Sequence, residues 1–353
     1  MKRLPARNEK QSAAVDLLAL AGFVEEFAGK KIVLFGDFVA DEFQYGEIAR
    51  VSREAPVLIL RHRQTEVVPG GGANAANNLA ALGARVSPVT AVGDDAAGDA
   101  LTSYFRRKGI DATGILRVKG WTTPTKTRFL AGFAHTVSQQ VLRMDREPAG
   151  TLPESARKKL RAVLAVKLRS ADALAVSDYG FGVASPEAVQ ESKRARRKPI
   201  PVTLDSRFRL HDYAGAGVTS ATPNEPELEA LHHANIGKNI EELKRCGAAT
   251  LKTMRLNALL VTRGRDGMAL FERGGGVAQI AVHGGDQAVD VTGAGDTVLA
   301  AYTLALACGA EPLEAAHIAN IAGGLVVMKR GTATVSREEL LSAIRHEAGG
   351  AAS

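Results

Sequence analysis

The stretch Asp290-Val291-Thr292-Gly293-Ala294-Gly295-Asp296-Thr297 is the most informative part of the sequence. It follows strand-like segments and precedes a strongly helical one that begins at Val298. Small residues at 293–295 let backbone N–H groups approach an anion, and the N-terminus of the following helix adds partial positive charge there. Asp296 would lie at the mouth of this anion site, where a carboxylate can accept the proton of an attacking hydroxyl group. Alternatively, the glycines form only a turn and Asp296 caps the helix.

The segments around this stretch alternate between helix and strand patterns. Such βαβ repetition predicts an α/β fold, namely a three-layer α/β/α core with a mostly parallel sheet, and ligands of such sheets bind at the carboxyl ends of the strands. We expect helices at 73–82, 96–108, 153–169, 185–197, 225–233, 239–253, 296–308, 312–328 and 336–347. We expect strands at 31–36, 85–92, 172–177, 200–205, 257–262, 267–272 and 277–283, and a short one ending at Thr222.

Two β-rich stretches, at about 42–68 and 113–145, do not fit this alternation and are predicted to pair as a small lid over the site. Residues 1–30 are interpreted as an N-terminal helical extension and residues 31–348 as one large domain that includes the lid. The small residues at 349–353 are expected to be a disordered tail.

Composition excludes several classes of protein. The chain has 353 residues and only two cysteines, which lack CxxC spacing, so we expect a cytoplasmic protein without a disulfide framework or a zinc cluster. No apolar run is long enough to span a membrane, so we expect no membrane partner. Its net charge is +7, but aromatic residues make up only 5% of it, which argues against a nucleic-acid partner. A nucleic-acid-binding function therefore rests on net charge alone, whereas a basic surface also suits phosphorylated substrates.

Two further motifs accompany the first. The glycine-rich run at 70–83 (GGGANAANNLAALG) opens a helix, and it can also be interpreted as a flexible turn before an alanine-rich helix. Asn224-Glu225-Pro226-Glu227 follows Pro223, and its simplest interpretation is a helix start with acidic residues favourably placed in the first turn.

These three motifs, in this order, resemble the signatures of the ribokinase-like (PfkB) family of carbohydrate kinases. The resemblance implies a ribokinase-like fold, ATP and Mg2+ as cofactors, and an ATP-dependent transfer of phosphate to a sugar hydroxyl. It implies that Asp296 is the catalytic base and that Gly293, Ala294 and Gly295 form the anion hole. Gly71, Gly72 and Asn74 would contact the sugar. Asn224 would contact ATP, and Glu227 would organise Mg2+ through water.

Further segments resemble bacterial kinases of D-glycero-β-D-manno-heptose 7-phosphate, which phosphorylate C1 of that sugar for the lipopolysaccharide core. These segments include 36–46, 50–57, 142–145, 177–180, 260–263 and 331–336. Members of that group often carry a fused adenylyltransferase domain, and the length of the present chain predicts the kinase portion only.

Other site residues follow from position and resemblance together. Asp37 and Asp41 end a predicted strand at the sheet's carboxyl edge, where carboxylates accept sugar hydroxyls, although solvation of a strand end explains them too. Arg128 and Arg143, in or beside the lid, are the candidate partners of the 7-phosphate. The resemblance further implies substrate contact for Asp178, ATP contacts for Thr262, Arg263, Gly264, Gly267, Asn320 and Gly323, and a K+ site at Asp290 and Thr292.

The sequence departs from the heptose kinase pattern at two places. Phe181 follows Asp178-Tyr179-Gly180 where that group has lysine, and Arg207 replaces the lysine of an Asp-Pro-Lys motif. A kinase of another sugar, sugar phosphate or nucleoside is therefore an open alternative, as is a non-catalytic sugar- or nucleotide-sensing protein on the same fold. Lid strands often mediate dimers in this family, so the resemblance implies a homodimer.

Overall fold

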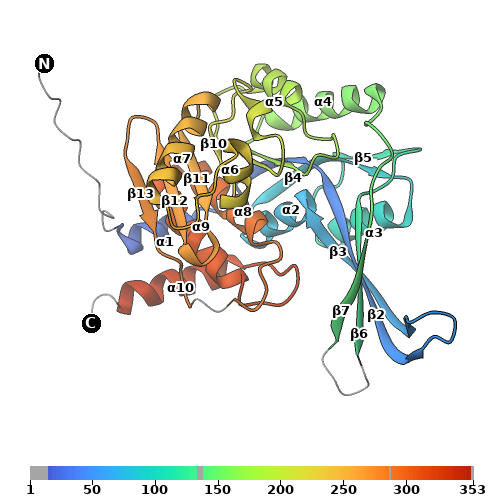
Figure 1. Cartoon of the computed structure of the whole chain (residues 1–353). Coiled ribbons are helices and arrows are strands. Elements are labelled where there is room, and N and C mark those ends of the chain that lie inside the picture. Colours follow the sequence, from blue (N-terminus) through green and yellow to red (C-terminus); the bar gives the residue numbers. More distant parts are fainter. Residues whose placement is uncertain (1–14, 133–137, 286–287, 351–353) are drawn as a thin grey trace, which may run out of the picture.

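The computed structural model describes residues 15–132, 138–285 and 288–350 (Figure 1). Within them, one large sheet has the strand order β13-β12-β11-β10-β9-β8-β1-β4-β5. Its strands are parallel from β5 to β11, and β12 and β13 add an antiparallel edge. The strands are β1 (Lys31–Gly36), β4 (Arg85–Gly93), β5 (Ile115–Val118), β8 (Ala173–Asp178), β9 (Val202–Ser206), β10 (Ser220–Ala221), β11 (Ala258–Thr262), β12 (Met268–Glu272) and β13 (Val277–Ile280). This mostly parallel sheet confirms the predicted fold class.

Two hydrophobic cores lie on opposite faces of this sheet, because successive side chains of a strand point to opposite sides. In β1, Ile32 and Leu34 enter one core, whereas Val33 and Phe35 enter the other. The first core is covered by α1 (Leu17–Glu25), α2 (Gly72–Ala81), α3 (Ala96–Arg107), α8 (Ala294–Ala307), α9 (Pro312–Val326) and α10 (Arg337–Gly350). The second core is covered by α4 (Glu154–Leu168), α5 (Pro186–Ser192), α6 (Glu225–His232) and α7 (Ile240–Met254).

The ends of the chain differ from the sequence expectation. Helix α1 buries Leu20 and Val24 in the first core, where α10 places Leu340 and Ile344, so residues 17–25 pack as part of the main domain. Helix α10 continues to Gly350, two residues into the predicted tail. Residues 1–14 and 351–353 lie outside the described part of the chain.

A second sheet projects from the core in Figure 1 and has the strand order β3-β2-β6-β7. It consists of β2 (Phe38–Val51), β3 (Leu58–Gly71), β6 (Thr125–Gly132) and β7 (Gln139–Arg146). The two β-rich stretches thus pair with each other, except that Ile115–Val118, expected in the lid, joins the large sheet as β5. Because β2 follows β1 after a single residue, the second sheet begins directly at the carboxyl edge of the first.

Among the described residues, no helix is both long enough and apolar enough to cross a bilayer.

Candidate active site

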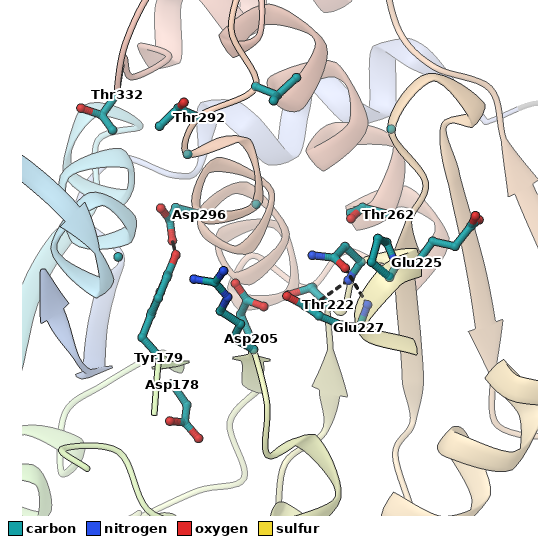
Figure 2. A pocket seen from close by; sticks show the side chains of 18 of the residues that line it. Asp178, Tyr179, Asp205, Thr222, Glu225, Glu227, Thr262, Thr292, Asp296 and Thr332 are labelled. Carbon is teal, nitrogen blue, oxygen red and sulfur yellow. Dashed lines mark hydrogen bonds between the residues drawn. The ribbon is translucent and has the colours of Figure 1, made fainter. Parts of the chain in front are cut away.

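A cavity of about 700 Å3 lies at the carboxyl ends of the parallel strands, between the lid strands and the N-terminus of α8 (Figure 2). The order of the strands brings its residues together from distant parts of the chain. The lining includes Asp41, Gly71, Lys126, Arg128, Asp178, Tyr179, Asp205, Arg207, Thr222, Asn224, Glu225, Glu227, Thr262, Arg263, Gly264, Thr292, Gly293, Gly295, Asp296 and Thr332. This is the sheet edge at which the sequence predicts the site.

Asp296 lies in the first turn of α8 and is 3% exposed. Its Oδ2 accepts a hydrogen bond from Asn74 Nδ2 at 2.8 Å, and its Oδ1 accepts one from the Tyr179 hydroxyl at 3.1 Å. Burial raises the pKa of Asp296 to about 7, against the lowering effect of these two hydrogen bonds. A carboxylate with this pKa is suited to act as a general base near neutral pH.

Backbone amides next to Asp296 face the same cavity. Gly293 has φ +78, which a residue with a side chain adopts only with strain. Within the described residues, no backbone carbonyl accepts a hydrogen bond from the N–H groups of Gly293, Gly295 or Asp296. The Ala294 N–H, in contrast, donates to Val291 O at 3.2 Å, so Ala294 does not serve the anion hole as the sequence predicts. The free donors at this helix N-terminus are positioned to bind an anionic group.

Asp41 and Arg128 form the lid side of the cavity. Arg128 Nη1 donates to Asp41 Oδ1 at 2.6 Å, and both side chains are largely buried. A Cβ atom at Gly70 would lie 2.4 Å from Asp41 Oδ2, so only glycine lets β3 pass this close to the carboxylate. Arg128 thus lines the cavity with its charge partly offset by Asp41, and its role as a phosphate partner stays a prediction.

The structure corrects the roles expected for two other carboxylates. Asp37 accepts backbone N–H groups from Tyr179, Phe181 and Val183 and does not line the cavity. Burial raises its pKa to about 6, and the charge of Asp178 adds to this effect.

Asp178 accepts hydrogen bonds from Gly180 N, Ser206 Oγ, Arg209 Nη2 and the Tyr213 hydroxyl. Figure 2 shows its carboxylate pointing away from Asp296. Both side chains, Asp37 and Asp178, are therefore saturated by internal partners and hold the loop after β8 in place.

Asn74 and Gly72 are also committed inside the protein. Asn74 is fully buried, donates to Asp296 and accepts from Asn78 Nδ2 at 3.1 Å, so it positions the base and is not a free partner for a sugar hydroxyl. The Gly72 N–H donates to Asp37 O at 2.9 Å. Of the glycine-rich run at 70–83, Gly71 alone lines the cavity.

The opposite end of the cavity carries Asn224 and Glu227 at the start of α6. They form a capping box, in which Asn224 Oδ1 accepts from Glu227 N at 2.8 Å and Glu227 Oε2 accepts from Asn224 N at 2.9 Å. Asp205 lies nearby (Figure 2), and burial together with the charge of Glu227 raises its pKa well above the usual value. The buried Thr222 hydroxyl between them has no partner among the described residues. Two carboxylates that repel each other beside an unpaired hydroxyl fit a divalent cation.

The residues predicted to bind ATP fall into two groups. Thr262, Arg263 and Gly264 line the cavity, but the Arg263 guanidinium is held by Glu225 Oε2 at 2.5 Å and Gly237 O at 2.9 Å.

The second group does not line the cavity and has structural roles. Asn320 donates to Ala281 O at 2.8 Å. Gly267 lies directly before β12 and has a positive φ. Gly323 packs against Val298.

The two residues predicted to bind K+, Asp290 and Thr292, lie in the loop before α8. Asp290 accepts the N–H groups of Thr292 and Gly331, both at 2.9 Å, and thereby ties the loop before α8 to the segment before α10. Across the described ranges, no group of three or more His, Cys, Asp or Glu side chains could hold a metal by itself.

A second cavity of about 400 Å3 adjoins the first and shares Lys126, Tyr179 and Arg207 with it. It is also lined by Arg143, Asp145, Glu147, Phe181 and Phe208, so three cationic side chains face two acidic ones. Arg143 is paired with Asp145 at 2.5 Å, whereas Lys126 and Arg207 form no ion pair in the described part of the chain. Burial lowers the pKa of Lys126, and Arg207 and Arg143 lower it further while Asp41 opposes them. Such a convergence of cations favours an anionic ligand.

Sequence reasoning missed Lys126, Tyr179, Asp205 and Thr332 as site residues. Tyr179 and Thr332 belong to segments that carry the family resemblance, which was the available signal for them. Asp205 follows a predicted strand in the way that Asp37 does, but Lys126 lies on a lid strand whose register the sequence does not reveal.

A buried base beside free helix-terminal amides, at the edge of a parallel sheet, defines a phosphotransferase of the α/β class. Residues 30–339 match the pfkB family of carbohydrate kinases, and the chain belongs to this family of ATP-dependent sugar kinases.

Its relatives include the bifunctional protein HldE of Geobacter sulfurreducens, which is 40% identical over 90% of this chain and 63% of the relative. The HldE protein of Mesorhizobium japonicum is 37% identical over 91% of this chain and 63% of the relative. The chain thus spans less than two thirds of the length of these relatives.

Solved structures share the fold. Phosphofructokinase-2 from Escherichia coli in complex with fructose-6-phosphate superposes with a TM-score of 0.71 at 19% identity, covering 90% of this chain and 99% of that one. Arabidopsis thaliana ribokinase complexed with ribose and ATP gives a TM-score of 0.68 at 21% identity, with the same coverage.

Proposed function

We propose that this chain transfers the γ-phosphoryl group of ATP to the C1 hydroxyl of D-glycero-β-D-manno-heptose 7-phosphate, a step toward the lipopolysaccharide core. The observation that carries the phosphotransfer is the buried Asp296 carboxylate beside the unpaired amides of Gly293 and Gly295. The heptose acceptor rests on the sequence resemblance to heptose 7-phosphate kinases and on the cationic second cavity.

In this mechanism the acceptor hydroxyl lies between Asp41 and Asp296. Its proton passes to the Asp296 carboxylate while its oxygen bonds to the γ-phosphorus and the bond from that phosphorus to the bridging oxygen of ADP breaks. The N–H groups of Gly293 and Gly295 donate to the charged oxygens of the group in transfer. Proton removal requires ionised Asp296, which a pKa of about 7 allows at neutral pH.

The phosphate already on the acceptor would enter the second cavity. Lys126 and Arg207 replace Arg128 as its partners in this proposal, because Arg128 is engaged by Asp41. Arg143 stands at the same cavity but is shared with Asp145. The guanidinium of Arg207 adds a charge to this cavity, in which Phe181 supplies none.

We assign Mg2+ to Glu227 and Asp205, the latter not expected from the sequence, with Asn224 fixing Glu227. When bound there, Mg2+ would neutralise part of the negative charge of the ATP phosphates. The proposal also includes a dependence of activity on K+, which would bind at the loop that Asp290 holds in place. The Asp290 carboxylate itself accepts two backbone N–H groups.

A panel of acceptors tests the substrate. ATP and Mg2+ are supplied with heptose 7-phosphate, unphosphorylated heptose, fructose 6-phosphate, fructose, ribose and a nucleoside, and the new phosphate is located by NMR. We expect the highest kcat/KM for heptose 7-phosphate, with the product phosphorylated at C1. Equal turnover of the unphosphorylated sugar contradicts the heptose 7-phosphate proposal, and absence of ATP turnover with every acceptor supports the sensing alternative.

We also propose a homodimer formed through the lid. Strand β7 is exposed along its whole length and carries Val141, Leu142 and Met144, with 45%, 59% and 49% exposure. Covering such a strand removes an unpaired sheet edge from solvent. Sedimentation at several concentrations checks the assembly, and a Leu142→Lys variant should shift it toward monomer.

We place the reaction in the cytoplasm. Cys246 and Cys308 are both free thiols, which suits a reducing compartment. Localisation of the tagged chain by cell fractionation tests this assignment.

A further inference from the structure

Tyr179 is the one side chain of the Ser177-Asp178-Tyr179-Gly180 segment that reaches the base. Its hydroxyl donates to Asp296 Oδ1 at 3.1 Å, and Figure 2 shows its ring reaching across the cavity from the loop after β8. The proposed mechanism assigns this hydroxyl no role.

The position of Tyr179 is fixed from three sides. Asp37 accepts the backbone N–H of Tyr179 at 2.9 Å and that of Phe181 at 3.0 Å, which anchors the loop to the start of the lid. Gly71, with φ +55, lies so close that an added Cβ would be 3.2 Å from Tyr179 Cε2. Lys126 Nζ lies 5.5 Å from the centroid of the ring. The tyrosine is thus held before any acceptor enters.

The Asp296 carboxylate would have rotational freedom without this contact. Rotation about the Cβ–Cγ bond of an aspartate is soft. Asn74 fixes one carboxylate oxygen and Tyr179 fixes the other, so the plane of the carboxylate is set by two donors from different elements. Both donors also favour the ionised form that a general base requires.

We propose that Tyr179 is a positioning residue for the base: its hydroxyl, held by the Asp37-anchored loop, orients the Asp296 carboxylate toward the acceptor hydroxyl. This inference rests on the proposed phosphotransfer by Asp296 and deepens it.

Other charged groups face Asp296 and must be kept constant in a test. They are Asp41 on β2, Lys126 on β6 and Asp205 at the end of β9. A Tyr179→Phe variant retains all three and removes a single hydroxyl. Loss of this donor disfavours the ionised carboxylate, so the pKa of Asp296 should rise and the acidic limb of the rate profile should move to higher pH.

The experiment compares Tyr179→Phe with a matched Tyr104→Phe variant, whose lost hydroxyl donates to Asn77 Oδ1 at 3.2 Å outside the cavity. Each variant is assayed with the acceptor that the wild type phosphorylates best, from pH 5.5 to 9. We expect Tyr179→Phe to lower kcat by about 10- to 100-fold, the range for a hydrogen bond to a charged group, and to shift the acidic limb upward. Tyr104→Phe should change neither quantity.

A second readout is independent of turnover. NMR of the protein with 13C-labelled aspartate carboxyl groups, assigned by difference from Asp296→Asn, gives the pKa of Asp296 directly, and it should be higher in Tyr179→Phe. An active wild type with an unchanged profile and an unchanged NMR titration in Tyr179→Phe overturns this inference and leaves the proposed function intact. A wild type inactive with every acceptor overturns both.

Discussion

The side-chain amide of Asn74 donates a hydrogen bond to Asp296 Oδ2 at 2.8 Å, although 222 positions separate the two residues in the chain. The glycine-rich motif before α2 and the one before α8 therefore meet at a single carboxylate. A Cβ at Gly293 would lie 2.4 Å from Asn74 Nδ2, so the glycine of one motif makes room for the asparagine of the other. The two motifs form one structural unit, with the amide holding the base and the free N–H groups beside it facing the anion.

Replacement of the base should separate activity from stability. Asp296→Asn should lower kcat by about 100- to 10,000-fold, because removal of a general base typically costs this much. The pKa of Asp296 is about 7 in the folded protein, above the ordinary value of 3.8. The protonated Asp296 therefore contributes to the free energy of unfolding below pH 3.8, and this contribution is lost as the pH rises through 7. At pH 8 the variant should therefore melt at the wild-type temperature or above it. The control is Asp94→Asn, which changes an exposed residue outside the cavity. Near-normal activity of Asp296→Asn would refute the role of Asp296 as the base.

The pH profile of the wild type should report the same carboxylate. Since the base must be ionised, kcat/KM should rise with pH through about 7 and level off above it. The measurement is a set of initial rates in buffers of constant ionic strength. A rate that is already at its plateau at pH 5 would show that burial does not raise the pKa of Asp296 in solution.

Asp37 and Asp41 should respond differently to removal. Asp37→Ala leaves three N–H groups, one buried and two partly buried, without an acceptor and should lower the free energy of unfolding by about 2–3 kcal/mol. Asp41→Ala should raise KM for the acceptor, and because it leaves the largely buried Arg128 guanidinium without its carboxylate partner it should lower stability as well. Denaturant titration and acceptor kinetics on both variants check this. The reverse pattern would show that Asp37 is the substrate residue.

Arg207 should matter for phosphorylated acceptors only. Arg207→Met removes an unpaired cation from the second cavity and should raise KM for heptose 7-phosphate about tenfold or more, because hydrogen bonds to charged groups are strong. The KM for an unphosphorylated sugar should not change. Lys119→Met, an exposed cation outside both cavities, controls for net charge. An equal rise in KM for both acceptors would place the phosphate elsewhere.

Gly71 and Gly120 offer a matched pair. Both have positive φ, at +55 and +76, but a Cβ at Gly71 would lie 2.9 Å from Val39 Cγ2, whereas nothing lies within 4 Å at Gly120. Gly120→Ala should cost roughly 1 kcal/mol of stability through backbone strain. Gly71→Ala should cost more and should also lower kcat, because the new methyl group presses on the ring of Tyr179. Equal melting temperatures for the two variants would contradict the close packing at Gly71.

Much of the fold follows from local sequence patterns. The helix and strand periods place nearly every element within a few residues, and the GAG turn predicts the helix start at which Asp296 lies. Periodicity does not distinguish Asp37 from Asp41, because the difference depends on which loop packs against each carboxylate. The same holds for Asn74, whose partner is 222 positions away. Lys126 could not be chosen as a site residue without the register of β6 on β2, and the contact of Tyr179 with Asp296 depends on the path of the loop after β8.

The second sheet shares its strands with the floor of the cavity. Strand β2 carries Asp41 near its beginning, and β3 ends at Gly71 against the ring of Tyr179. Each strand is 14 residues long and continues outward along the projection, with register shifts in their pairing between Tyr45 and Gly46 and between Ile48 and Arg50. The same two strands therefore form both the outer part of the second sheet and the part that carries Asp41 and Gly71 at the cavity. A contact made on the outer part of the second sheet thus involves the same two continuous strands that end at the cavity, so the periphery of the molecule and the cavity wall are parts of one sheet.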